Sequence, residues 1–146
     1  MRCAHSRRAW WRADDGQVSA FVTALVVAIL ALTGLSLDGG LALAAKVAAG
    51  GQAQSAARAG AQMIDLTRYR TSGELLLDRD RAESAASEFL AAAGAAGTVR
   101  VAGDTVTVEV TATAPTQVLG VIGIRSLTVH GSGKAHARRG VNGVEP

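Results

Sequence analysis

The sequence predicts an α+β protein: an N-terminal transmembrane helix that continues into an Ala-rich stalk helix, followed by a second helix and a small three-stranded antiparallel sheet. Three observations predict this fold. Residues Gln17 to Leu37 form a run of 21 without a charged side chain. The Ala-rich segment after it repeats small residues at helical spacing. From Thr98 onward apolar and polar residues alternate, as they do in half-buried strands.

The uncharged run 17–37 has the length of a membrane span. A helix rises about 1.5 Å per residue, so roughly 20 residues cross the ~30 Å hydrocarbon layer of a bilayer. Eleven of the twenty residues from Val18 to Leu37 are Val, Ile, Leu or Phe. Together they favour insertion by roughly 3 to 6 kcal/mol. The lipid bilayer is therefore the first partner that the sequence predicts.

Basic residues near the span predict its orientation. The leader 1–16 carries four arginines, whereas the first basic residue after the span is Lys46. The positive-inside rule then places the leader in the cytoplasm and the rest outside, in a single-pass protein of the cell membrane. A cleavable signal peptide is the alternative, with Ala42-Leu43-Ala44 as its site. Because signal peptides have apolar regions of about 7–15 residues, the longer run here favours an uncleaved anchor.

Residues 38–70 are predicted to form a helical stalk. Asp38-Gly39-Gly40 is expected to be a hinge, and Gly50-Gly51 is expected to bend the helix because each glycine costs about 1 kcal/mol relative to Ala. Small residues form a stripe that permits close packing of another element. That element is either a copy of the chain or a related subunit, or the chain's own sheet. The residues of this stripe are Ala49, Ala53, Ala57 and Gly60.

Residues 71–137 are predicted to form a small extracytoplasmic α+β domain. A helix begins after Asp78 or Asp80, with Glu83 placed for a capping box, and ends before Gly94. Its expected buried face consists of Ala82, Ala85, Ala86, Phe89 and Leu90. Three strands at 98–101, 105–114 and 126–137 follow, with a short apolar helix at 116–123 between the last two. Residues 138–146 are predicted to be a disordered tail.

Composition and motifs argue against several classes of function. From Asp38 to the end there are 11 basic and 10 acidic residues, and aromatic residues make up 3% of the chain. We therefore expect no nucleic-acid partner and no small-molecule substrate. Cys3 is the only cysteine, and His130 and His136 have no nearby carboxylate in the sequence. Without a catalytic motif or a set of metal ligands, the sequence predicts no enzyme, cofactor or metal site.

The N-terminal half resembles a known family. Arg12-Ala13-Asp14-Asp15-Gly16 leads directly into the span, the span ends in Leu37-Asp38-Gly39-Gly40, and the Ala-rich stretch 52–61 follows. From Asp14 to Asp65 the chain resembles the TadE/TadG-like proteins of the tight-adherence (Flp) pilus assembly system of high-GC Gram-positive bacteria. The resemblance implies prepilin-type cleavage between Gly16 and Gln17. Pilin-type signals place Glu five residues after the cut, where this chain has Phe21.

The function implied by this resemblance is a non-catalytic, membrane-anchored minor pilin-like component of Flp/Tad pilus assembly or secretion. Its partners would be other pilin-like or pilus assembly subunits. Two alternatives stay open from the sequence. One is a membrane-tethered extracellular binding module, and the other is a small secreted protein released by signal cleavage.

Overall fold

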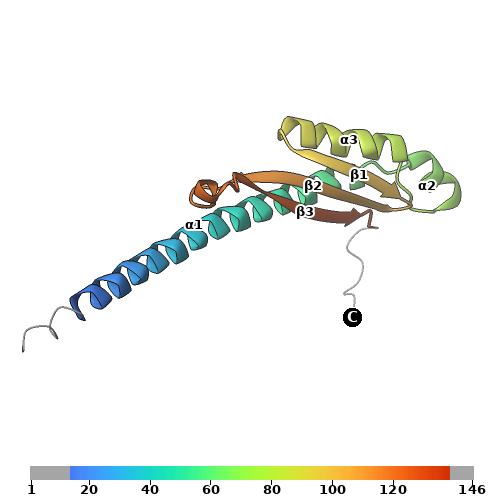
Figure 1. Ribbon diagram of the computed structural model, residues 1–146. Helices are drawn as coiled ribbons and strands as arrows, with labels where there is room; N and C mark the ends of the chain where they lie inside the picture. Colours follow the sequence, from blue (N-terminus) through green and yellow to red (C-terminus); the bar gives the residue numbers. More distant parts are fainter. Residues whose placement is uncertain (1–13, 139–146) are drawn as a thin grey trace, which may run out of the picture.

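The computed structural model describes residues 14–138, with side chains from Val18 onward. A long helix leads into a compact α+β unit at its C-terminal end (Figure 1). The leader 1–13 with Cys3, and the tail from residue 139, lie outside the described residues. In chain order the elements are α1 (Asp14–Ala61), α2 (Leu66–Ser72), α3 (Arg79–Ala92), β1 (Ala96–Ala102), β2 (Thr105–Pro115), η1 (Leu119–Ile122) and β3 (Ser126–His136).

Helix α1 runs without a break through both glycine pairs, so the hinge predicted at Asp38-Gly39-Gly40 was wrong, and the helix also continues through Gly50-Gly51. Its 48 residues correspond to a length of about 72 Å. A Cβ built on any of these four glycines meets nothing within 4 Å, so none of them makes room for another element. Packing on one side of α1 holds the helix together and outweighs the low helix propensity of glycine.

That packing follows one stripe of residues on α1, the seam. Its members are buried or half-buried and recur every three or four residues along the same side of the helix. All are small except one aspartate. The seam consists of Gly34, Asp38, Ala42, Ala45, Ala49, Ala53, Ala57 and Gly60. Because its second half forms part of the core, α1 packs there on the chain's own sheet, one of the two packing partners that the sequence left open.

The seam fits closely against the glycines of β3. A Cβ on Gly131 would clash with the backbone of Ala49 and Gly50, and one on Gly133 with the backbone of Ala53 and Gln54. Two strand residues advance about 6.6 Å and four helix residues about 6 Å, so strand and helix stay in step. The Gln54 side chain adds two hydrogen bonds, donating to the Lys134 carbonyl at 3.1 Å and accepting from its amide at 3.3 Å.

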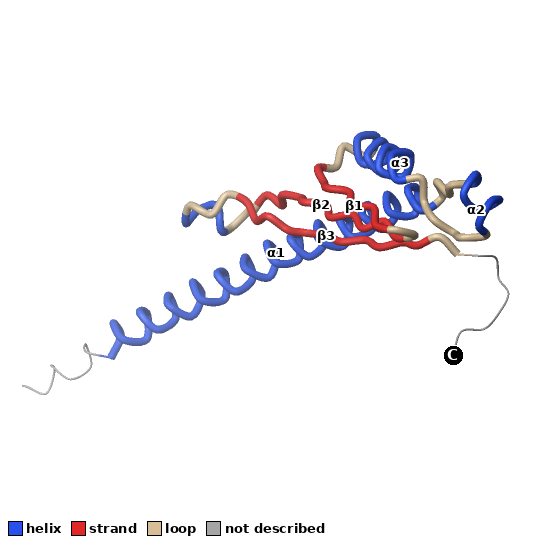
Figure 2. Tube along the Cα trace, turned by 90° about the vertical axis from the view of Figure 1, so that its right-hand side faces the viewer, coloured by secondary structure: helices blue, strands red, loops and turns tan. Residues whose placement is uncertain are grey.

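The three strands form an antiparallel sheet in the order β1-β2-β3, which confirms the predicted sheet. Val106, Val108 and Val110 of β2 are buried, as their alternation with threonine predicted. Both long helices pack on this face: α1 along β3 and β2, and α3 along β1 (Figure 2). Their backbones meet at Gly60, where a Cβ would lie 2.8 Å from the Ala82 carbonyl oxygen. The opposite face of the sheet is polar and exposed.

Helix α3 matches its predicted bounds, and the structure uses one of the two N-caps that the sequence offered. Asp78 is the N-cap, and its carboxylate accepts a hydrogen bond from the Arg81 amide at 3.2 Å. Gly94 follows the helix with a φ of 64°, the left-handed conformation that glycine favours at this position. Ala82, Ala86 and Leu90 are buried, whereas Phe89, which was expected in the core, is exposed. With Asp78 as the N-cap, Glu83 does not take part in a capping box.

We predict that Gly133→Ala lowers the free energy of unfolding by about 1 to 3 kcal/mol, because its new methyl group must push strand and helix backbones apart. The matched control is Gly51→Ala, which adds the same methyl group to an open helical site and should raise stability by about 0.5 to 1 kcal/mol. Denaturant unfolding of the two variants in detergent tests this prediction. Equal effects of the two substitutions would contradict the close contact.

Candidate functional site

The first half of α1 has the properties of a helix in lipid. Its eleven large apolar side chains between Val18 and Leu37 are 48–69% exposed, on all sides of the helix. The hydroxyls of Thr23, Thr33 and Ser36 donate to the carbonyls of Ser19, Ile29 and Leu32, which leaves these polar groups satisfied without water. Within residues 14–138, α1 is the one helix long and apolar enough to cross a membrane, a test that an N-terminal signal sequence also passes.

Asp38 lies where this apolar half meets the sheet domain. It is 1% exposed, and its carboxylate faces the start of η1 in the loop between β2 and β3. Oδ1 accepts from the Gln117 amide at 2.7 Å. Oδ2 accepts from the Val118 amide at 3.0 Å and the Leu119 amide at 2.7 Å. The carboxylate thus satisfies three consecutive amides at the beginning of the short helix η1.

The same loop contacts α1 one turn earlier. A Cβ on Gly34 would lie 2.5 Å from a methyl carbon of Val118, so glycine is needed for the loop to approach the helix this closely. Gly34 and Asp38 are four residues apart and therefore lie on one side of α1. Together they attach the loop to the helix by a side-chain contact and by charge-assisted hydrogen bonds.

The loop amides change the acidity of Asp38. The hydrogen bond from the Leu119 amide is the main cause that lowers the pKa of this carboxyl, with further lowering from the Gln117 and Val118 amides; burial opposes them. The net effect is to lower the pKa of Asp38 from the ordinary aspartate value. Donors directed at the carboxylate stabilise its charged form, so the group stays ionised next to an apolar segment.

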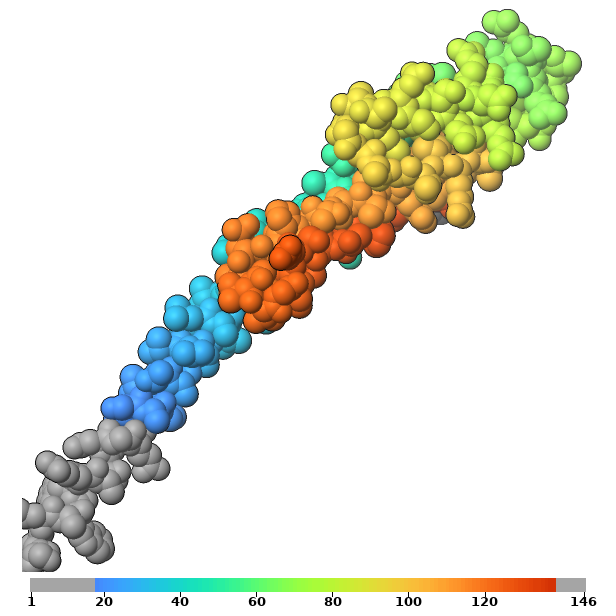
Figure 3. Space-filling view, turned by 45° about the horizontal axis from the view of Figure 1, so that its top comes forward, coloured from blue at the N-terminus to red at the C-terminus, as the bar shows by residue number. Residues whose placement is uncertain are grey.

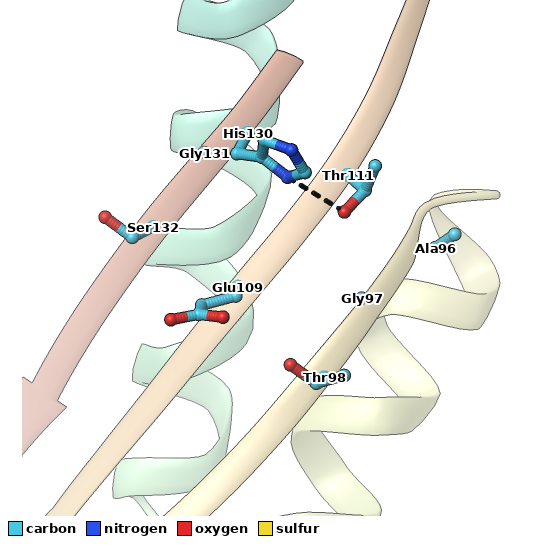
Figure 4. Close-up of a pocket in the computed structure, with 8 residues that line it drawn as sticks. All are labelled: Ala96, Gly97, Thr98, Glu109, Thr111, His130, Gly131 and Ser132. Carbon is cyan, nitrogen blue, oxygen red and sulfur yellow. Dashed lines mark hydrogen bonds between the residues drawn. The ribbon is translucent and has the colours of Figure 1, made fainter. Parts of the chain in front are cut away.

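A second feature is a hollow on the exposed face of the sheet, with a volume of about 510 Å³ (Figure 4). Thr111 Oγ1 and His130 Nδ1 form a hydrogen bond of 3.2 Å across it. Glu109 lies opposite Thr98 on one neighbouring strand and opposite Ser132 on the other. His130 is thus engaged with a hydroxyl rather than with a carboxylate. The side chains that line the hollow therefore form a polar surface, and no carboxylate among them orients His130 as a base.

Possible metal ligands are scattered over the described part of the chain. No group of three or more His, Cys, Asp or Glu side chains in residues 14–138 is placed to hold a metal ion. His130 bonds to Thr111, and His136 Nε2 accepts from the Arg138 guanidinium at 2.9 Å. Neither histidine therefore shares a site with the other.

The structure places the predicted interface residues inside the protein. Ala49, Ala53 and Ala57 are at most 1% exposed, and Gly60 faces α3 and β2. Of the two packing partners left open by the sequence, the chain's own sheet is therefore the one that this stripe contacts. Gly16 and Gln17 lie in the first turn of α1, upstream of the residues whose side chains the structure describes.

Sequence reasoning missed the attachment of the loop at Gly34 and Asp38. Asp38 was interpreted with Gly39 and Gly40 as a hinge, because acidic residues followed by glycines are common in turns. A signal was present nonetheless: a lone acidic residue directly after an apolar span needs donors close by if it is buried. Which amides supply those donors depends on a loop about 80 positions away, and no local pattern predicts it.

No protein-family model, curated protein or solved structure matched this chain.

We predict that Asp38→Asn frees the 116–124 loop from α1. The asparagine side chain keeps one acceptor oxygen but turns an NH₂ group toward the amides, so Val118 and Leu119 lose acceptors. Hydrogen exchange at residues 117–119 should rise strongly, while exchange in β2 near Val108 stays slow. Glu88→Gln, which removes an exposed charge on α3, is the control and should leave the loop unchanged. Unaltered protection in Asp38→Asn would contradict the attachment.

The attachment should also depend on pH. Because the pKa of Asp38 is lower in the folded protein, the ionised carboxylate contributes stability that is complete above the ordinary aspartate range. This contribution is lost as the pH falls through the lower pKa of the folded state. The difference in loop protection between the natural chain and Asp38→Asn should therefore persist at neutral pH and shrink in strong acid. A difference that disappears already near pH 6 would contradict this assignment.

Proposed function

We propose that this chain is a non-catalytic, membrane-anchored structural subunit of a cell-envelope assembly, of the pilus-assembly type that its N-terminal half resembles. The observation that carries the proposal is the division of α1. One half exposes apolar side chains on all sides, and the other half is the core helix of the sheet domain. One unbroken helix thus ties the orientation of the domain to that of the segment in lipid.

The alternative of a cleaved signal peptide fits the structure less well. Cleavage after Ala44 would remove Gly34 and Asp38, the two residues that hold the loop between β2 and β3. It would also shorten the core helix to little more than the part that packs on β3. The intact helix supports a permanent anchor, with the N-terminus in the cytoplasm as the arginines of the leader predict.

Partner subunits have an accessible surface on α1. Just beyond the predicted span, Leu43 and Val47 are 62% and 69% exposed. They are four residues apart and lie on the side of the helix opposite the seam, since a helix has 3.6 residues per turn. The apolar face therefore continues past Leu37, where a neighbouring anchored helix can cover it. This surface replaces the buried small-residue stripe as the proposed contact with sister subunits.

We predict that Val47→Cys, in a Cys3→Ser background that leaves no other cysteine, forms disulfide-linked species in the native membrane. The control is Arg58→Cys, which is also exposed and lies on the same side of α1, but 11 residues, or about 16 Å, further from the span. Cross-linking at position 47 and not at position 58 is expected, and mass spectrometry identifies the partner. Efficient cross-linking at position 58 alone would contradict the proposed contact.

We expect the mature chain to be recovered from membranes with α1 present. Mass determination separates the possible forms: an intact chain, a chain that begins at Gln17 after prepilin-type cleavage, or one that begins near Ala45 after signal cleavage. The first two agree with a permanent anchor, and the second also supports a pilin-like role. A soluble product that begins near Ala45 would overturn the proposal.

A tethered binding module is the second candidate, and the hollow around Glu109 and His130 is the surface that it would use. The hollow is lined by small and polar side chains and by no Trp, Tyr or Phe, the large rings that often supply much of the binding energy in a recognition site. We therefore favour the structural subunit.

A further inference from the structure

The loop between β2 and β3 presents an apolar tip that no other part of the described chain covers. Val121 and Ile122 of η1 are 87% and 72% exposed, and Ile124 after it is 44% exposed. Such side chains rarely gather on the surface of a small domain without a partner. We refer to Val121, Ile122 and Ile124 as the loop tip.

The loop tip lies at the end of the sheet domain that faces the exposed half of α1. Figure 3 shows the loop at the place where the long helix leaves the domain. Val118, at the base of the loop, contacts Gly34, which lies inside the predicted span. Gly34 precedes Asp38 by four residues, or about 6 Å along the helix. The loop therefore lies beside the last turn of the predicted span, about one helical turn into the membrane from its outer end.

Backbone amides of the loop are hydrogen-bonded within the protein, as a segment in lipid requires. Asp38 accepts the amides of Gln117, Val118 and Leu119, so the start of the loop has its donors paired. Within the loop, the amides of Val121, Gly123 and Ile124 donate to the carbonyls of Val118, Gly120 and Leu119 at 3.1 Å each. Backbone at membrane depth must satisfy its polar groups internally, and this loop does so at each of these positions.

The charges around the tip also fit a lipid surface. Residues 115–125 contain no acidic side chain and end in Arg125, which is exposed at the rim of the loop. A basic residue beside an apolar tip is the arrangement found where protein segments lie in the headgroup layer, since the cation can remain among lipid phosphates.

We propose that the loop tip inserts into the membrane leaflet on the side of the sheet domain, so that the protein contacts lipid through η1 as well as through α1. This inference rests on the membrane anchor proposed above. A second copy of the chain is a less suitable occupant, because a stable interface needs about 800 Å² from each partner and three side chains supply much less. The two contacts together fix the rotation of the domain about the axis of α1.

Depth-dependent fluorescence quenching in vesicles tests the proposal with the full-length chain. In a Cys3→Ser background, single cysteines are introduced as Ile122→Cys, Val27→Cys and Ser132→Cys and labelled with an environment-sensitive dye. Val27 is the middle of the predicted span, and Ser132 lies on the exposed face of the sheet. The vesicles contain phosphatidylcholine and phosphatidylglycerol, with spin-labelled lipids whose quenching group lies near the headgroup or deep in the acyl chains.

The proposal predicts that the headgroup quencher reduces the fluorescence of the dye at position 122 more than the acyl-chain quencher does. The dye at position 27 should respond more to the deep quencher, and the dye at position 132 to neither. Quenching at position 27 without quenching at position 122 would overturn the loop contact and leave the anchor intact. No quenching at position 27 would overturn the anchor itself. A blue-shifted but unquenched signal at position 122 that grows with protein density would assign the tip to a second copy.

Discussion

The close contact between the small-residue seam of α1 and the glycines of β3 is the interaction on which the rest of this fold depends. With 146 residues and 3% aromatics, the chain has few large side chains with which to build a core. It compensates by bringing backbones together at Gly131 and Gly133, where no side chain separates strand from helix. The branched side chains of Val106, Val108 and Val110 fill the space beside that contact. Dispersion contacts at short range thus replace the burial of large rings.

This contact also determines how the sheet domain is joined to the apolar helix. The seam that packs β3 continues to Asp38 and Gly34, so the loop between β2 and β3 is held by the same side of the same helix. No flexible linker separates the two halves of α1, even though it contains two glycine pairs. A rotation of the apolar segment is therefore transmitted to the domain. In the proposed role as an anchored subunit, this rigidity keeps one face of the domain directed at its neighbours.

Local patterns were sufficient to predict most of the elements of the fold. The alternation of valine and threonine in 105–114 predicted both the central strand and its buried face, and Gly94 marked the end of α3. The sequence could not establish how α1 is used. Ala49, Ala53 and Ala57 suit a contact with another subunit or with the chain's own sheet equally well, because small residues permit close approach to any backbone. Only the complementary glycines at 131 and 133 decide between the two.

Asp38, at the junction of the two halves of α1, also shows that local sequence patterns cannot predict a contact between distant segments. An aspartate followed by two glycines is locally typical of a turn, and the helix persists there because distant amides and Val118 hold it. Helix propensity is a weak predictor when tertiary contacts run along a whole face of the helix. The apolar segment 116–123 was likewise expected to be a short helix. Its position beside the end of the span could not be predicted, because that position depends on the register of β2 with β3.

The continuity of α1 in a membrane is the central claim, and a distance between two labels on this helix tests it most directly. Spin labels at Leu25→Cys and Arg58→Cys, in the Cys3→Ser chain reconstituted in lipid, are separated by 33 residues. Pulsed electron spin resonance should then give one narrow distribution near 50 Å, the length of an unbroken helix. A broad distribution, or a mean that is shorter by 10 Å or more, would show that the helix bends at its glycine pairs and would contradict the account.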